Sequence, residues 1–182
     1  GLRPPYAATS TNSAPVIPVT LLDEGGPFCT PIGGPFWTPI DSPAILQYLA
    51  DLRPKYGLAP ENGSLERVRL QEWLNFITAE IHAGSSPLFD KSLPTAVQEI
   101  VKAKLFRRLD IVEARLADAD YLMGERFTVA DVYLFTVLGW MRFFSIGLDR
   151  WPSLPGYVRR VAERPSVSAA LAREQEIAPV AE

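Results

Sequence analysis

The chain has 182 residues, of which 47% are hydrophobic and 21% charged, and these values are ordinary for a globular protein with one sizeable core or two small ones. A formal net charge of −3, without a cluster of lysine and arginine, argues against a nucleic-acid partner. A single cysteine cannot form an internal disulfide, and the first residues lack the apolar segment of a signal peptide, so a reducing cytoplasm is expected. The first residue is not methionine, which leaves open that the chain is a fragment.

The first 40 residues are rich in proline and glycine and predict little regular structure. Residues 1–15 show no hydrophobic periodicity, so we expect an irregular tail, followed by a short strand at 16–22. An octapeptide is then duplicated: GGPFCTPI at 25–32 is followed at once by GGPFWTPI at 33–40, with seven of the eight positions identical. Because solenoid repeats have periods of about 20 residues or more, we expect a lengthened loop over 25–40.

Helical signals begin at residue 43, where a proline in the first turn and apolar residues on one side predict a helix over 43–52. Ser64 is placed to cap a second helix, whose apolar residues recur at helical spacing: Leu65, Val68, Trp73, Phe76, Ile77 and Ile81. A third helix is predicted to open with a capping box over Thr95–Gln98, and its apolar residues fall at steps of four and three: Val97, Val101, Leu105, Leu109, Val112 and Leu116.

Residues 129–144 form the most apolar run of the chain. The run is shorter than the roughly 20 residues that a membrane span needs, and it contains Asp131 and Arg142, so it predicts a buried core helix. Thr128 is placed to cap this helix, with the Asp131 carboxylate returning a hydrogen bond to the Thr128 N–H.

A last helical region is predicted to start at Trp151-Pro152 and to be interrupted by Pro165 before a final turn or two through Leu171. The connections between these helices are short, and short connections join antiparallel neighbours. The part of the chain after about residue 58 therefore predicts a helical bundle.

Several of these segments together resemble the glutathione transferases. GERFTVAD at 124–131 resembles the capping motif of that family's helical domain, and WPSL at 151–154 and RPSV at 164–167 resemble its closing helices. Similarity to the bacterial beta class in particular is carried by LER at 65–67, QEWLNF at 71–76, EIH at 80–82 and SPLF at 86–89. DSPAILQYL at 41–49 and IPV at 17–19 resemble segments of the family's thioredoxin-like domain.

The resemblance implies a mixed fold, with an incomplete thioredoxin-like α/β part over 16–53 and an all-α helical-bundle domain over 58–182. It implies a homodimer that transfers glutathione, as a co-substrate rather than a bound cofactor, to small hydrophobic electrophiles in detoxification. No metal, nucleic-acid or membrane partner is expected.

The resemblance also implies roles for five residues. The backbone of Ile17 would pair with the cysteinyl peptide of glutathione, beside Pro18 as a cis proline. Asp41 and Ser42 would hold the γ-glutamyl end, where a carboxylate suits the ammonium group and a hydroxyl with a helix N–H suits the carboxylate. His82 corresponds to the beta-class histidine that faces the glutathione sulfur.

The chain also departs from the family pattern. Residues 1–15 do not resemble the first strand–helix–strand unit, so the active-site cysteine of the beta class has no counterpart. Ala83 stands where a basic residue commonly follows the histidine. Asp41 is one methylene shorter than the usual Glu or Gln, which reduces its reach.

Each candidate has a simpler structural interpretation. His82 continues a polar stripe and is compatible with a solvated or capping histidine, and Asp41 with Ser42 equally suits a turn and cap. Cys29 is disfavoured as a nucleophile because the equivalent position of the duplication is Trp37 and no basic residue is near it in sequence. One apolar run suits the floor of a hydrophobic pocket: Trp140, Met141, Phe143 and Phe144. For such a run, however, packing in the core is the default interpretation.

Two functions therefore compete. The first is a glutathione transferase, and the second is a non-catalytic or fragmentary family member that acts as a ligand-binding or dimerisation scaffold.

Overall fold

The computed structural model describes residues 41–177, with side chains described as far as residue 174. By internal contacts these residues belong to one compact unit, separate from residues 1–40. The predicted strand at 16–22, the duplicated loop 25–40, Ile17, Pro18 and Cys29 lie outside the described residues.

The described part of the chain is helical, and its β-structure is limited to two isolated bridges in the turn between residues 121 and 126. In chain order the elements are α1 (Ser42–Asp51), η3 (Pro54–Tyr56), α2 (Leu65–Phe76), η4 (Ile77–His82), α3 (Ala83–Ser85), η5 (Ser86–Phe89), α4 (Thr95–Leu116), α5 (Val129–Leu138), η6 (Gly139–Phe144), α6 (Ser153–Ala162) and α7 (Pro165–Ile177). Of these, η4 is a π-helix, whereas η3, η5 and η6 are 3₁₀-helices.

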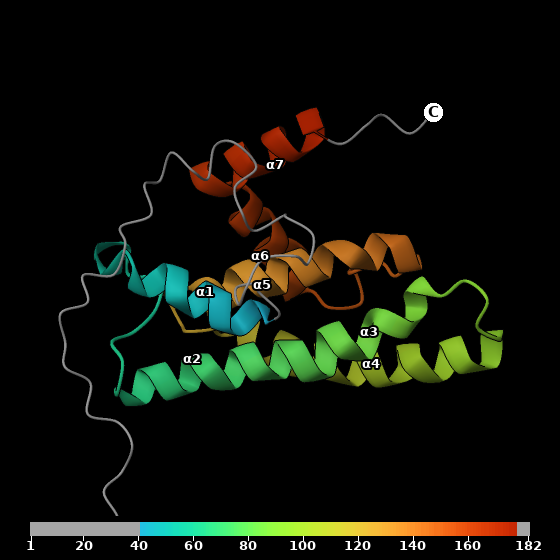
Figure 1. The fold of residues 1–182 in the computed structure, drawn as a ribbon. Helices are drawn as coiled ribbons and strands as arrows, with labels where there is room; N and C mark the ends of the chain where they lie inside the picture. Colours follow the sequence, from blue (N-terminus) through green and yellow to red (C-terminus); the bar gives the residue numbers. More distant parts are fainter. Residues whose placement is uncertain (1–40, 178–182) are drawn as a thin grey trace, which may run out of the picture. The chain divides into compact units, whose positions relative to one another are not determined.

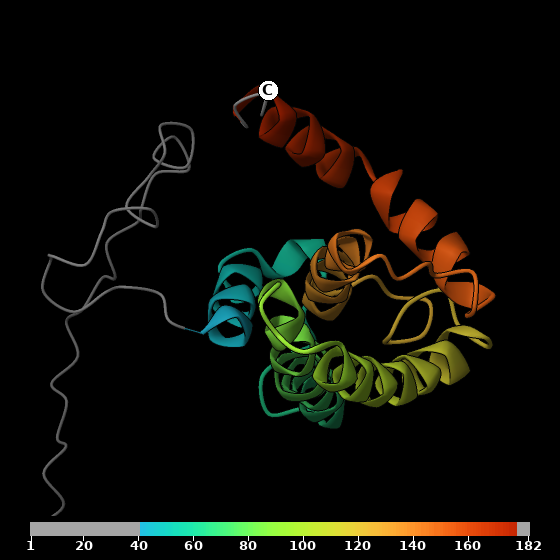
Figure 2. The ribbon, with the colours of Figure 1, turned by 90° about the vertical axis from the view of Figure 1, so that its right-hand side faces the viewer.

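The elements α2, η4 and α3 follow one another as a single long rod, and α4 lies alongside it (Figure 1). The helix α5 is at the centre, where it contacts α1, α2, η4, η6 and α6. Figure 2 shows α1, α2, α4 and α5 as a cluster, with α6 and α7 diverging along its outside. This antiparallel bundle confirms the helical domain expected from the sequence.

The burial of α5 explains its composition. Seven of its ten residues are buried: Val129, Ala130, Asp131, Tyr133, Leu134, Val137 and Leu138. This helix is apolar nearly all round because other helices surround it. The prediction of a buried core helix over 129–144 is confirmed for residues 129–138, whereas η6 continues as a 3₁₀-helix in which Phe143 is exposed. Within residues 41–177 no helix is long and apolar enough to cross a membrane.

The predicted capping box at the start of α5 is also confirmed. The Thr128 N–H and hydroxyl both donate to Asp131 Oδ2, at 2.8 Å and 3.1 Å. The other carboxylate oxygen, Oδ1, accepts from the Leu122 N–H at 2.9 Å and from the Tyr157 hydroxyl at 3.2 Å. Asp131 is fully buried, and this burial raises the pKa of its carboxyl even though the four donors favour the charged form. One carboxylate therefore connects α5, the preceding turn and α6.

A second buried charge joins α1 to α2. Arg67 is 4% exposed, and its guanidinium donates two hydrogen bonds to the Asp51 carboxylate, at 2.9 and 2.7 Å. The same guanidinium donates to Gln47 Oε1 and to the Pro60 carbonyl oxygen. Arg67 therefore holds α1 against α2. The candidate site residue Asp41 caps the start of α1, so its position depends on this contact.

Two expectations about the helices were wrong. The helix α4 begins after Pro94, so Thr95 is already helical and cannot cap, and Gln98 donates to the Leu93 carbonyl instead. On α2, Leu65 and Val68 are 68% and 48% exposed, and the buried face is made by other residues: Arg67, Leu70 and Leu74. The spacing of apolar residues alone did not identify the buried face of α2, because Leu65 and Val68 fit that spacing and yet stay exposed in the described bundle.

The helix α7 is also longer than expected. It begins at Pro165, as the interruption predicted, but extends to Ile177 rather than ending near Leu171.

We expect Asp131→Ala to lower the free energy of unfolding by about 3 kcal/mol or more, because the change leaves the Leu122 N–H and the Thr128 N–H buried without an acceptor. Urea denaturation followed by circular dichroism measures the change. Asp118→Ala, an exposed carboxylate in the same region, serves as the control and should shift stability by less than about 0.5 kcal/mol.

The contact between Asp51 and Arg67 predicts a pH dependence of stability. The hydrogen bond from Arg67 lowers the pKa of Asp51 below its ordinary value of 3.8. A carboxyl whose pKa is lower when folded stabilises the protein fully above its unfolded pKa, and this contribution is lost as the pH falls through the folded value. The urea midpoint of the wild type should therefore exceed that of Asp51→Asn at pH 7, and the difference should shrink below about pH 4. A constant difference down to pH 3 would contradict the proposed charge interaction.

Candidate functional site

His82 ends the π-helix that interrupts the long rod formed by α2 and α3. A π-helix has an i→i+5 hydrogen-bonding pattern, and such turns within helices occur frequently at functional sites. Ile77 and Ile81 of the same turn are fully buried, so the turn is anchored in the core. His82 itself is half-buried, so part of its side chain still reaches the surface.

The His82 ring is held by two aromatic side chains. Its Nδ1 lies 2.7 Å from the hydroxyl oxygen of Tyr133 on α5, a residue 51 positions further along the chain. Its ring packs edge-on against Trp140 of η6, with centroids 4.7 Å apart and planes at 88°. Among residues 41–177, no carboxylate forms an ion pair with His82.

Ring contacts continue from His82 outward to the surface. Trp140 packs against Phe89 of η5 with ring centroids 5.5 Å apart, and Phe89 packs against Phe144 with ring centroids 4.7 Å apart. Phe89 is 51% exposed and Trp140 half-buried, whereas Phe144 is buried. A partly exposed aromatic surface, made by Phe89 and Trp140, therefore adjoins the histidine.

The sequence left open whether the apolar run of η6 forms core or pocket floor, and the structure divides it. Met141 and Phe144 belong to the core, Trp140 is half-buried, and Phe143 is 63% exposed with Arg142 stacked over its ring at 4.7 Å.

Asp41 and Ser42 lie at the exposed start of α1. Asp41 is the N-cap, and its Oδ1 accepts a hydrogen bond from the Ala44 N–H at 2.9 Å. The capping interpretation is therefore correct for Asp41. No hydrogen bond among the described residues joins either residue to His82.

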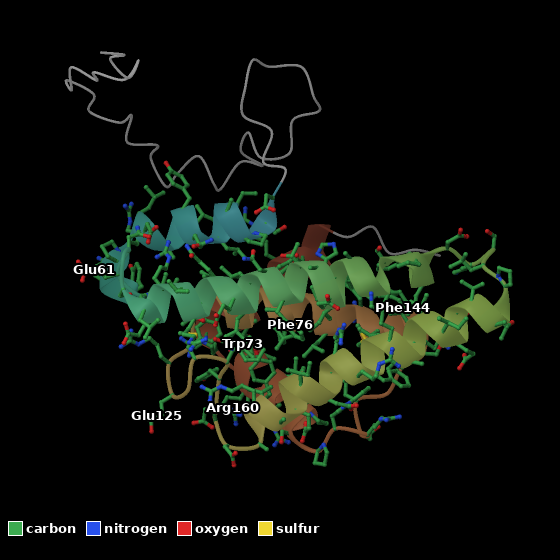
Figure 3. All side chains as sticks on the ribbon, turned by 90° about the horizontal axis from the view of Figure 1, so that it is seen from below. Glu61, Trp73, Phe76, Glu125, Phe144 and Arg160 are labelled. Atoms are coloured by element: carbon green, nitrogen blue, oxygen red, sulfur yellow. The ribbon has the colours of Figure 1, made fainter. Side chains whose placement is uncertain are left out.

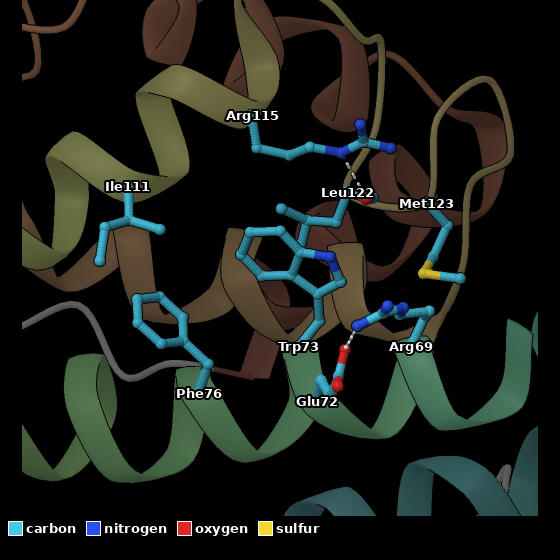
Figure 4. Close-up of a pocket in the computed structure, with 8 residues that line it drawn as sticks. All are labelled: Arg69, Glu72, Trp73, Phe76, Ile111, Arg115, Leu122 and Met123. Carbon is cyan, nitrogen blue, oxygen red and sulfur yellow. Dashed lines mark hydrogen bonds and ion pairs between the residues drawn. The ribbon is translucent and has the colours of Figure 1, made fainter. Parts of the chain in front are cut away.

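An apolar groove of about 540 Å³ opens between α2, α4 and the turn that precedes α5 (Figure 4). Trp73 and Phe76 point from α2 toward α4 and pack edge to face, with centroids 5.8 Å apart (Figure 3). The charged residues at the rim are engaged: Arg69 pairs with Glu72 at 2.7 Å, and Arg115 donates to the Leu122 carbonyl. The groove is thus an apolar surface with a polar edge, and His82 does not line it.

The described residues contain no group of three or more histidine, cysteine, aspartate or glutamate side chains that would suit a metal ion.

Comparison with known proteins identifies the family. Residues 76–165 match the model of the glutathione S-transferase C-terminal domain. The chain is 40% identical over 131 residues to glutathione S-transferase GstA of Escherichia coli O157:H7, covering 72% of this chain and 65% of that protein.

Two solved structures are similar in both sequence and fold. A sphingomonad glutathione S-transferase complexed with glutathione is 37% identical, with a TM-score of 0.71, 76% of this chain covered and 68% of that one. A bacterial beta-class glutathione S-transferase from Sphingomonas chungbukensis is 39% identical, with a TM-score of 0.70, 74% of this chain covered and 67% of that one.

This chain belongs to the glutathione S-transferase family. The resemblance to bacterial beta-class glutathione transferases, inferred from motifs, is thereby confirmed. The similarity spans about two thirds of the length of these relatives, with 65% for the Escherichia coli protein.

In this glutathione transferase chain, the sequence identified His82 but not the residue that binds it. Tyr133 belongs to a helix whose other buried side chains are mostly apolar, and a buried tyrosine hydroxyl usually requires a hydrogen-bond partner. That requirement was the available signal, but the partner was not predictable because 51 residues separate the two positions.

Proposed function

We propose that the protein conjugates the thiol of glutathione to small hydrophobic electrophiles, with glutathione as co-substrate, no metal, and a cytoplasmic location. The observation that carries the proposal is the half-buried His82, bound to Tyr133 and beside an aromatic surface, in a chain of the glutathione S-transferase family. A relative of 37% identity whose structure was solved in complex with glutathione supports the choice of co-substrate.

We also propose the division of the chain on which this function depends. Residues 16–53, which include the duplicated loop 25–40, would belong to a partial thioredoxin-like, glutathione-binding part, and 58–182 to the all-α domain. Residues 1–15 would be an irregular tail.

The reaction needs a thiolate, because the thiol itself is a poor nucleophile. With a chlorinated nitrobenzene as electrophile, the sulfur forms a bond to the ring carbon, chloride leaves with the bonding electrons, and the thiol proton passes to solvent. Lowering a thiol pKa by about two units near neutral pH stabilises the thiolate by about 2.7 kcal/mol, and one oriented donor supplies part of that amount. We assign this donor role to His82.

The remaining assignments concern binding. Ile17 and Pro18 would present an edge to the cysteinyl peptide of glutathione. Asp41 and Ser42 would bind the γ-glutamyl end, since Asp41 uses one carboxylate oxygen for its cap and Oδ2 makes no hydrogen bond within residues 41–177. Phe89 and Trp140 would contact the apolar electrophile.

The test is retention of the whole chain on immobilised glutathione together with turnover of a chlorinated nitrobenzene. His82→Ala should lower kcat by about tenfold or more. It should also lower the unfolding free energy by about 1–3 kcal/mol, because it leaves the buried Tyr133 hydroxyl without its acceptor. Asn75→Ala, an exposed polar residue on the same rod, is the control and should leave both values unchanged.

Asp41→Asn separates capping from binding in the same assays. Asparagine caps helices as well as aspartate does, so stability should stay the same while the KM for glutathione rises. If the wild type is not retained on immobilised glutathione and does not turn over the electrophile, the enzymatic function is rejected. That result would favour the alternative, a non-catalytic scaffold.

We propose that the protein forms a homodimer, and that the groove between α2 and α4 is its interface. Trp73 and Phe76 are half-buried there, and Ile111 is 46% exposed. Leu65 and Val68, which are exposed on α2, add apolar surface to the same helix. A second copy of the chain would remove this surface from water.

Ile111→Arg should convert the dimer to a monomer in sedimentation velocity, because an unpaired charge buried in the interface costs about 3 kcal/mol or more. Phe143→Arg replaces an apolar residue of η6 that is also exposed but lies outside the groove, and it should leave the sedimentation coefficient unchanged. A wild type that sediments as a monomer at all concentrations would rule out the homodimer.

A further inference from the structure

The hydrogen bond between His82 and Tyr133 limits the ways in which the imidazole can hold its proton. Tyr133 is 6% exposed, and among residues 41–177 the only hydrogen bond of its hydroxyl is the one to His82 Nδ1. A phenol O–H that is removed from water needs an acceptor. The unprotonated imidazole nitrogen is the acceptor in reach, so the phenol donates and Nδ1 carries no proton.

The other ring nitrogen then has a defined state. In a neutral imidazole one nitrogen is a donor and the other an acceptor, so an Nδ1 that accepts leaves the proton on Nε2. Nε2 makes no hydrogen bond to the described residues, and it is not one of their buried unpartnered atoms. The Nε2–H is therefore open to solvent or to a ligand.

The orientation of the ring is restrained as well. Trp140 packs edge-on against the imidazole, and Tyr133 lies at 67° to it with centroids 5.8 Å apart. Because Tyr133 is on the central helix α5 and His82 ends the π-helix, the bond joins two anchored backbone segments. A donor with its tautomer and direction set in advance loses little free energy when it binds an anion.

We infer that Tyr133 is a positioning residue that holds His82 in the tautomer with the proton on Nε2, so that Nε2–H donates to an anionic group of the ligand. The identity of that group as the glutathione thiolate rests on the proposed function. The tautomer itself does not.

The chain allows a direct test because His82 is its only histidine. In tag-free protein labelled with nitrogen-15, two-bond proton–nitrogen correlation spectra show one pair of imidazole nitrogens. The spectra are recorded at a pH high enough that they no longer change with pH. We expect Nε2 at the shift of a protonated nitrogen and Nδ1 at that of an unprotonated, hydrogen-bonded one. A protonated Nδ1 in the wild type would overturn the inference.

Tyr133→Phe keeps the buried ring and removes only the hydroxyl. Both imidazole nitrogens should then move toward the averaged shifts of a freely exchanging histidine. Tyr121→Phe makes the same change at a tyrosine that packs on Phe127, whereas the ring contacts of His82 within residues 41–177 are with Tyr133 and Trp140, so this variant should leave the spectrum unchanged. Identical spectra for wild type and Tyr133→Phe would also overturn the inference.

Turnover adds an independent readout. Tyr133→Phe should lower kcat about fivefold, the worth of one ordinary hydrogen bond, with little change in the KM for glutathione. Because Tyr133 acts through His82, the double variant with His82→Ala should be no slower than His82→Ala alone. Additive losses would contradict a positioning role.

The two proposals fail in different ways. If the wild type neither binds glutathione nor turns over the electrophile, the proposed function fails, and the nitrogen shifts still decide whether Tyr133 sets the tautomer. If turnover is present and the shifts are unaffected by Tyr133→Phe, the enzyme stands and the positioning role is rejected.

Discussion

The buried carboxylate of Asp131 is the interaction on which the arrangement of the described helices depends. It accepts hydrogen bonds from two backbone N–H groups and from two hydroxyls, and these donors come from the start of α5, the turn before it and α6. A charge removed from water is tolerated only when such donors replace its hydration. The donors come from three segments. The need to hydrogen-bond the buried carboxylate therefore fixes both the first turn of α5 and the packing of α6 against it.

The position of α5 has a consequence for the candidate site. Once its first turn is held by Asp131, the next turn carries Tyr133 toward the rod formed by α2 and α3. The π-helix ending at His82 brings the imidazole to meet it. The candidate site is therefore an outcome of core packing, since the hydroxyl of a core residue binds the ring of a half-buried one.

Much of this organisation was predictable because it depends on short-range physics. Ser64 caps α2, Thr128 and Asp131 form a capping box, and Pro165 begins a new helix, as local sequence patterns indicated. The capping box predicted at Thr95 was wrong because Pro94 occupies the N-cap position and the helix already begins at Thr95. Local patterns were also insufficient at Leu65 and Val68, whose exposure depends on which neighbours pack against α2.

The sequence by itself determined the family, the helical class of residues 58–177 and the candidate His82, because these follow from motifs and from the spacing of apolar residues along one chain. Only the tertiary structure decided what surrounds that histidine. The partners Tyr133 and Trp140 are distant in sequence, and their contact with His82 depends on the packing of α5 and η6 against the rod. Side-chain periodicity specifies which face of a helix is apolar, whereas the partner of a polar atom is specified only when two such faces meet.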